Sequence, residues 1–291
     1  MALACALAAC GHPHAHSSGP SLGPVVAGPA LDGVDRTRDP ACAARWAAGV
    51  VGRVVDESGA PMQGIVGQAC VLATSGRRVC LAPGETSATG VFTVVVPQEQ
   101  RCAAEIALRV FDRSRATATV YAMARDPDRE GVVYATRDVV MFALDPAANL
   151  PAAGDASAQR TIALAAGIEL RVAPAALDDY AALAARMLDP DEAALAGLGG
   201  GETLDTVVAL GPEQSVRGGA ASLRIPTRLA AGSSAEILVL GGLYTTRADG
   251  STVGEGTWER IALAQVADDG SVSTAGGPLS ALGWVGVRAS D

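Results

Sequence analysis

The chain is 291 residues long, with 49% hydrophobic and only 3% aromatic residues, and its formal net charge is −9. This length suits about two domains, whose interiors must be filled mostly by Ala, Val and Leu. All 22 basic residues are arginine, and the sequence has no concentrated basic stretch of the kind that contacts with nucleic-acid phosphates require. The composition therefore argues against nucleic acid as a partner.

The first ten residues resemble a bacterial lipoprotein signal. Residues 7–10 (Leu-Ala-Ala-Cys) fit the lipobox, in which small residues precede a cysteine that becomes lipidated. The apolar run is too short to span a bilayer but matches the core of a signal peptide. The usual positive charge at the start is missing, which leaves a start codon upstream of Met1 or an Ala-rich start without signal function as alternatives. The resemblance implies a signal peptide over residues 1–10 and a lipidated Cys10, carrying palmitate-type acyl chains. With Gly11 after the cysteine, it also implies the outer membrane.

A flexible linker is expected over residues 11–41. This segment is rich in Gly, Pro and Ser and shows no sustained period. It contains every histidine of the chain: His12, His14 and His16. Three imidazoles could bind Zn²⁺ or Ni²⁺ weakly, but a polar spacer explains them more simply. We therefore expect no metal site and no cofactor.

The first folded domain is expected over residues 42–145. Residues 50–66 combine a β-branched strand with an Asp-Glu-Ser-Gly-Ala-Pro turn, and residues 86–92 (Thr-Ser-Ala-Thr-Gly-Val-Phe) lead into a second strand that ends at Pro97. The pattern G-x-V-x-D-x-x-G-x-P followed by T-x-x-x-G-x-F resembles the bacterial carboxypeptidase regulatory-like domain, over about residues 48–112. That resemblance implies a small transthyretin-like β-sandwich with a structural or recognition role.

Four cysteines fall inside or beside this domain: Cys42, Cys70, Cys80 and Cys102. An even set in an exported protein indicates two disulfides. Zinc is the alternative, but no C-x-x-C pair exists and no histidine lies near in sequence. Three pairings are possible. We favour Cys70–Cys80 across a hairpin that turns at residues 75–76, which leaves Cys42–Cys102.

Strand alternation is clear in residues 105–111. Ile106, Leu108 and Val110 share one face, whereas Glu105 and Arg109 point the other way. Further strands are expected at residues 118–123, 132–135 and 138–144. A linker rich in Pro, Ala and Gly over residues 146–158 should separate the two domains, with few contacts across it.

The second domain is expected over residues 159–291. It begins with strands at residues 162–164 and 168–172, followed by a helix at about residues 175–188, in which Leu177, Tyr180 and Leu183 follow helical spacing. Beyond this point the sequence predicts strand after strand, with Asp-Gly turns between several of them. The expected strands are residues 207–210, 221–225, 235–240, 258–266 and 284–287.

Trp258 and Trp284 are the candidate binding residues of this domain. They could form a sugar-binding surface, although core anchors of an aromatic-poor sandwich are the simpler interpretation. The folded part has no histidine and no lysine, which excludes Ser-His-Asp and Cys-His catalysis, His-built metal sites and lysine nucleophiles. A hydrolase built on two carboxylates is the remaining catalytic class.

The expected fold is therefore all-β, with two β-sandwich domains, the first transthyretin-like and the second with a short helix insertion. The expected function is that of a lipid-anchored envelope protein whose modules act in structure or recognition, without catalysis. A carbohydrate- or peptide-binding subunit of an envelope complex is the alternative, and a carboxylate hydrolase is a more distant one. Partners would be the membrane, through the lipid, and other envelope proteins or glycans.

Overall fold

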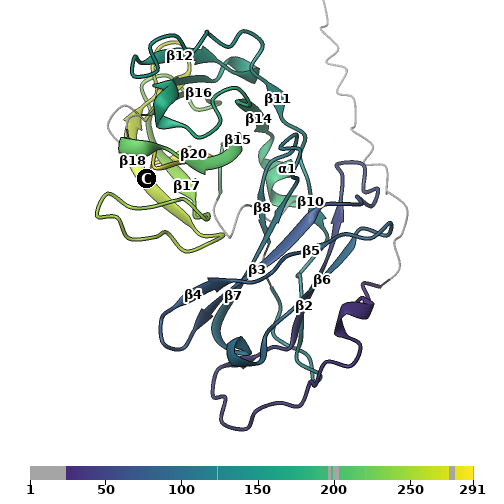
Figure 1. Ribbon diagram of the computed structural model, residues 1–291. Coiled ribbons are helices and arrows are strands. Elements are labelled where there is room, and N and C mark those ends of the chain that lie inside the picture. The colour runs from purple at the N-terminus through teal and green to yellow at the C-terminus, as the bar shows by residue number, and fades with distance from the viewer. Residues whose placement is uncertain are drawn as a thin grey trace, which may run out of the picture.

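The computed structural model describes residues 24–122, 124–195, 198, 203–219, 221–274 and 279–290. Its strands form four sheets that pack as two sandwiches, one above the other in Figure 1. We call residues 45–144 the N-terminal sandwich and residues 145–289 the C-terminal sandwich. The expectation of an all-β fold is confirmed. Cys10 and the three histidines lie outside the described residues.

The N-terminal sandwich is built from strands β1 to β10. One sheet has the order β1-β7-β3-β4, with β5 beside β3 and β8 beside β7, and the other has the order β10-β2-β6, with β9 beside β2. The strands are β1 (Arg45–Trp46), β2 (Gly49–Val55), β3 (Val66–Ala73), β4 (Arg78–Cys80), β5 (Gly84–Glu85), β6 (Val91–Val95), β7 (Cys102–Phe111), β8 (Val120–Ala122), β9 (Val132–Tyr134) and β10 (Val139–Val140). Short 3₁₀ turns occur at η1 (Pro29–Leu31) and η2 (Gln98–Gln100).

The prediction that one face of β7 lies in a core is confirmed. Ile106, Leu108 and Val110 are buried between the two sheets, together with Phe92 of β6. Phe92 fits because the facing position on β3 is a glycine: a Cβ atom on Gly67 would lie 2.3 Å from the Phe92 ring. A core with few aromatics therefore places one large ring against a residue that has no side chain.

The predicted turn after β2 is held by Asp56. Its Oδ1 accepts hydrogen bonds from the Ser58 and Ala60 amides and from the Ser58 hydroxyl, at 2.8, 2.9 and 2.6 Å. The Ser58 hydrogen bond is also the main reason that the pKa of Asp56 lies below its usual value. Gly59 adopts the positive φ of 83° that the reversal needs.

The C-terminal sandwich is built from strands β11 to β20. Its sheets have the orders β11-β14-β15-β20-β17-β18 and β12-β13-β16-β19. The strands are β11 (Asp145–Pro146), β12 (Arg160–Ala163), β13 (Glu169–Val172), β14 (Ala184–Leu188), β15 (Thr206–Ser215), β16 (Ser222–Pro226), β17 (Ser234–Leu240), β18 (Trp258–Gln265), β19 (Ser271–Ser273) and β20 (Ala281–Ala289). The 3₁₀ turns are η3 (Ala165–Gly167), η4 (Pro174–Ala176) and η5 (Arg217–Gly219).

The prediction of a helix over residues 175–188 is wrong. This segment continues from η4 into an extended turn and then into β14, which lies inside the larger sheet between β11 and β15. Buried Gln214 explains the extended turn, because its side-chain Oε1 accepts hydrogen bonds from the backbone amides of Asp178 and Asp179, at 2.8 Å each. Pairing with a neighbouring strand therefore outweighs the helical propensity of an Ala-rich segment.

A short helix does occur just beyond this segment, as α1 (Pro190–Leu195). It places Asp191 and Glu192 in its first turn, where the helix dipole favours acidic side chains. None of the helices in the described residues is long and apolar enough to cross a membrane.

The two sandwiches share one hydrophobic cluster. Leu108 and Phe142 on the N-terminal side belong to the same set of packed, buried residues as Leu188, Leu240 and Trp284 on the C-terminal side. A separate cluster, which includes Leu170, fills the far part of the C-terminal sandwich. The expectation that few contacts connect the two halves is therefore not met, and the boundary between them is a packed junction.

Candidate functional site at the junction of the two sandwiches

Trp284, on β20, is one of the side chains that join the sandwiches. It is only 3% exposed. Its ring packs edge-on against Phe142, with 6.0 Å between ring centroids, and its indole Nε1 donates a hydrogen bond to the Thr119 carbonyl oxygen at 2.5 Å. Both of these contacts are with the N-terminal sandwich. Trp284 therefore anchors one sandwich on the other.

Trp258, on β18, is also buried, with 8% of its surface exposed. Its Nε1 donates a hydrogen bond to the Leu198 carbonyl oxygen. A sugar-binding surface needs an open aromatic face, and neither tryptophan offers one in this structure. Their burial favours the interpretation of Trp258 and Trp284 as core anchors.

An ion pair is buried at the centre of the junction. Arg109 of β7 lies 2.9 Å from Glu213 of β15, and the two side chains are 11% and 7% exposed. The guanidinium donates through both Nε and Nη2 to Glu213 Oε2, and it also lies over the Phe111 ring, 4.4 Å from the ring centroid. Such a pair is stable in a buried setting only when its remaining hydrogen-bonding positions are also satisfied.

Tyr121 and a backbone amide complete this arrangement. The Tyr121 hydroxyl donates to Glu213 Oε1, and the Leu243 amide donates to the Tyr121 oxygen at 2.7 Å. The approach requires glycine at position 242, because a Cβ atom there would lie 2.6 Å from Glu213 Oε1 and 2.8 Å from the Tyr121 oxygen. Residues of both sandwiches are thus tied into one buried network.

Backbone irregularity aims Glu213 at its partner. The register between β15 and β20 shifts between Ala209 and Gln214, and Glu213 lies within this shift. Such bulges turn a side chain away from the regular alternation of a strand. Gly211, in the same stretch, lets Leu144 approach the strand, because a Cβ atom there would lie 2.2 Å from Leu144 Cδ1.

The electrostatics of the network follow from burial. Burial is the largest influence on the pKa of Tyr121 and, with the neighbouring Glu213 carboxylate, raises it well above its usual value. Burial alone would lower the pKa of Arg109, but the adjacent Glu213 side chain outweighs this effect and raises it. The network therefore keeps the Tyr121 phenol neutral at neutral pH beside the Arg109 guanidinium.

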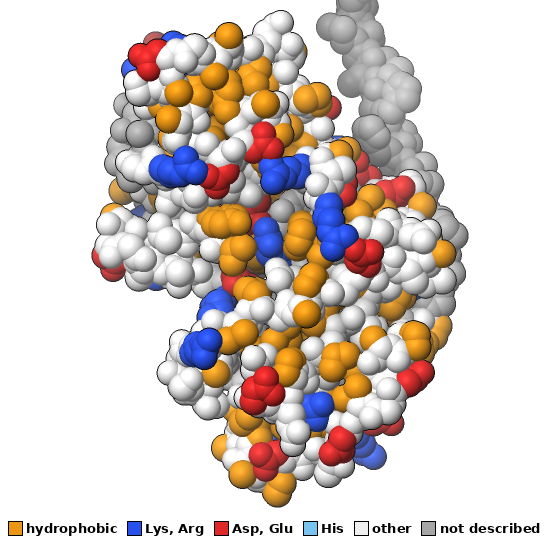
Figure 2. Space-filling view, in the orientation of Figure 1, with side chains coloured by type: hydrophobic (Ala, Val, Ile, Leu, Met, Phe, Trp, Pro, Cys, Tyr) orange, Lys and Arg blue, Asp and Glu red, His pale blue; other side chains and the backbone are white. Residues whose placement is uncertain are grey.

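Arg186 and Arg78 are among the further arginines that cross the junction. Arg186 of β14 lies 2.5 Å from Glu57 of the N-terminal sandwich, and its guanidinium lies 5.8 Å from the centroid of the Phe142 ring. In the other direction, Arg78 of β4 lies 2.8 Å from Glu255 of the C-terminal sandwich. Burial raises the pKa of Glu255 despite this arginine. On the face shown in Figure 2, arginines and acidic residues are interspersed.

Both disulfides have the favoured pairing. Cys70 and Cys80 are directly opposite each other on β3 and β4, and Cys42–Cys102 ties the segment before β1 to the start of β7. The hairpin turns at the predicted place, where Gly76 has a φ of 83°. The first disulfide fixes β4, and with it Arg78, against β3.

A groove of about 990 Å³ runs along β6, away from the junction. It is lined by residues 24–30 and 82–89 and by β6 itself, the last strand of its sheet in the described residues. The residues lining it include prolines, valines and threonines but no aromatic residue, and Glu85 is their one carboxylate. A pair of carboxylates facing each other, as glycoside hydrolysis requires, is therefore not found in this groove.

Arg109 and Glu213 were not identified from the sequence. Arg109 was correctly placed on the face of its strand opposite the core, but that face is covered by the C-terminal sandwich. The two residues are 104 positions apart, and the sequence has no signal that pairs one arginine among 22 with one carboxylate among 31.

Comparisons with known proteins find only distant similarity, and only among solved structures. No family model matches the chain, and no curated protein matches it. Among solved structures, it is similar to a variant of BcpA, the major pilin subunit of Bacillus cereus, with 10% identity, 84% of this chain and 59% of that chain covered, and a TM-score of 0.22. It is also similar to a double mutant of the shaft pilin SpaA from Lactobacillus rhamnosus GG, with 11% identity, 79% and 81% covered, and a TM-score of 0.23.

A third similar structure is a tetra-tandem repeat in the extending region of a large adhesion protein. Its identity is 13%, the coverage is 77% of this chain and 64% of that one, and the TM-score is 0.15. The chain thus spans 59% of the first of these proteins. At such TM-scores, no residue role is transferred from any of them.

Proposed function

We propose that this chain is a structural β-sandwich protein of the bacterial cell envelope, held at the outer membrane by lipid on Cys10 and without catalytic activity. The observation that carries the proposal is the junction. Charged side chains with little exposure, Arg109 and Glu213, and the buried Trp284 fasten one sandwich to the other, which suits a stiff spacer. The similarity of residues 48–112 to the carboxypeptidase regulatory-like domain, a structural and recognition module, supports the same role.

Lipid anchoring is supported by the lipobox at residues 7–10 and by the polar segment behind it. Several acyl chains contribute about 0.8 kcal/mol per buried CH₂ group, which is enough for stable attachment. The test compares Cys10→Ala with Cys5→Ala, a matched change at another cysteine of the same segment, in a bacterial host and from the true start codon. Cys10→Ala should lose the acyl label and leave the membrane fraction, and Cys5→Ala should retain both. An unchanged label in Cys10→Ala would contradict the proposal.

The groove along β6 favours a second function, the binding of an extended peptide of another envelope protein. The edge of β6, which pairs with no further strand among the described residues, offers backbone hydrogen bonds to such a peptide, and the non-aromatic lining fits a peptide better than a sugar. Val95, in the groove and 36% exposed, is the position to change. Peptides selected on the wild-type chain should lose binding to Val95→Asp. Selected peptides that bind both chains equally would argue against this function.

A further inference from the structure

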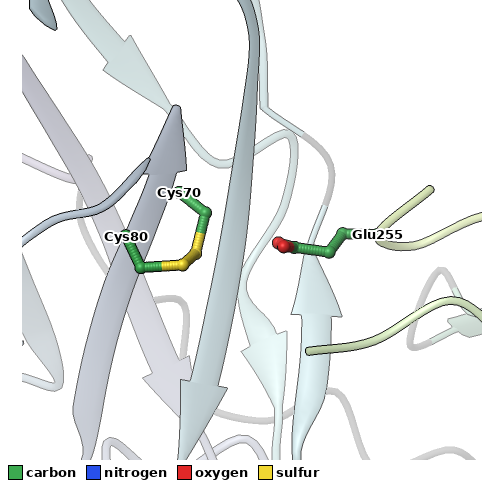
Figure 3. Close-up of side chains that lie close together, drawn as sticks. All are labelled: Cys70, Cys80 and Glu255. Atoms are coloured by element: carbon green, nitrogen blue, oxygen red, sulfur yellow. A yellow bond between two sulfur atoms is a disulfide. The ribbon is translucent and has the colours of Figure 1, made fainter. Parts of the chain in front are cut away.

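The disulfide Cys70–Cys80 lies beside a carboxylate of the other sandwich. Figure 3 shows the Glu255 side chain directed toward the two sulfurs. The two sulfurs and a Glu255 oxygen lie within 4.8 Å of one another. In the described part of the chain, no other three side chains of the types His, Cys, Asp and Glu are placed closely enough to hold a metal ion.

Glu255 has a polar atom that the protein leaves unsatisfied. Its side chain is only 3% exposed, and its Oε1 lies 2.8 Å from Arg78. Its Oε2 is buried without a hydrogen-bond partner in the structure. A buried, unpaired carboxylate oxygen is costly, so its presence next to two cysteines calls for a ligand.

We propose that reduction of Cys70–Cys80 converts this corner into a binding site for a thiophilic divalent cation, Zn²⁺ in the first place. The ligands are the two thiolate sulfurs and the Glu255 carboxylate. Zinc–sulfur and zinc–oxygen bonds of about 2.3 and 2.0 Å place tetrahedral ligand atoms some 3–4 Å apart. In the oxidised chain the two sulfurs are 2.05 Å apart and the Glu255 oxygen lies within 4.8 Å of both. Reduction would let the sulfurs separate to the spacing that a tetrahedral cation requires.

The chemistry balances in two steps. A dithiol reductant delivers two electrons and two protons to the S–S bond and itself becomes a disulfide, leaving Cys70 and Cys80 as thiols. The cation then displaces both thiol protons. Two thiolates and one carboxylate around a divalent cation leave one negative charge, which the adjacent Arg78 neutralises. Cys80 is half-buried, and this side gives the reductant and the cation access.

The site goes beyond a scaffold role, because its ligands come from both sandwiches. Cys70 and Cys80 lie on β3 and β4, and Glu255 lies in the segment before β18. In the oxidised chain, the ion pair between Arg78 and Glu255 connects the two sandwiches here. In the reduced, metal-bound chain, the cation would connect them. The two sandwiches would therefore stay connected at this point in a reducing environment.

The experiment is a Co²⁺ titration of the full chain, followed by displacement with Zn²⁺. Cys5, Cys10, Cys42 and Cys102 are replaced by Ser and the three linker histidines by Gln in every sample, because reduction would also open Cys42–Cys102; Cys70 and Cys80 are then the only thiols that reduction produces. The reduced chain should bind one equivalent of Co²⁺ with a thiolate-to-cobalt charge-transfer band. The oxidised chain and the reduced Cys70→Ser/Cys80→Ser variant should show no such band.

Glu255→Gln supplies the decisive comparison. It should keep the thiolate band but bind at least about tenfold more weakly. Its matched control is Glu105→Gln, a half-exposed carboxylate 3.9 Å from Arg78 that is not a proposed ligand; this variant should bind like the wild type. Three results would overturn the proposal: no binding to the reduced chain, equal affinity in Glu255→Gln, or loss of the β-sheet circular dichroism on reduction.

Discussion

The buried pair of Arg109 and Glu213 gives the sharpest prediction. Glu213→Gln keeps the size of the side chain and an oxygen that can accept from Tyr121, but it removes the charge opposite Arg109. A buried charge that loses its partner costs about 3–5 kcal/mol. Because only 11% of Arg109 is exposed, water can compensate little of this cost. We therefore expect the free energy of unfolding to fall by about 3–5 kcal/mol.

The assay is equilibrium unfolding in urea, monitored both by tryptophan fluorescence and by far-ultraviolet circular dichroism. Because the pair lies in a core common to both sandwiches, the wild type should unfold in one transition with both probes coinciding. The double variant Arg109→Met/Glu213→Gln should recover most of the loss, since it leaves no unpaired charge. Arg113→Gln is the control: Arg113 and its partner Glu85 are 63% and 53% exposed, so its cost should stay within about 1 kcal/mol.

A loss below about 1 kcal/mol in Glu213→Gln, equal to that of the exposed control, would refute the reasoning. It would show that water reaches the pair in the folded protein. Two separate transitions in the wild type would show that the sandwiches unfold independently, as the sequence alone suggested.

Two further predictions concern the core of the C-terminal sandwich and the loss of stability at high pH. Leu170→Ala removes a fully buried side chain from the core of the C-terminal sandwich and should cost about 2–5 kcal/mol in urea unfolding; a cost below 1 kcal/mol would contradict the packing described. For Tyr121, the folded-state pKa is raised, so its contribution to stability is complete below the unfolded pKa of about 10 and is lost as pH rises toward the folded value. Stability measured from pH 8 to 11 should therefore fall more steeply above pH 10 in the wild type than in Tyr121→Phe, and equal slopes would show that the phenol is not buried.

Local structure was predictable where short-range physics decides it. The alternation in residues 105–111 placed Leu108 in a core because side chains of a strand point to opposite faces. The turn at Asp56 followed from side-chain capping and a glycine with positive φ. The hairpin expected at residues 75–76 favoured the pairing of Cys70 with Cys80 over the other possible pairings, because a tight turn brings the flanking positions together.

Residues 184–188 show where such reasoning stops. Alanine and leucine at helical spacing predict a helix, yet the segment is a strand, because β11 and β15 offer it hydrogen bonds on both sides. The capture of two amides by Gln214, 35 and 36 residues away, is not encoded in any local pattern. Propensity is a weak preference, and the neighbours supplied by the fold override it.

The sequence by itself thus determined an all-β chain with its turns, its disulfide hairpin and the faces of its clearest strands, because these depend on neighbours a few residues apart. Only the tertiary structure decided that the outer face of β7 is covered, that Arg109 meets Glu213, and that Glu255 lies beside Cys70 and Cys80. These contacts join residues far apart in the chain, and their partners are selected by how the two sandwiches pack. Packing, rather than residue type, therefore determines which of the many charged side chains become buried at the junction.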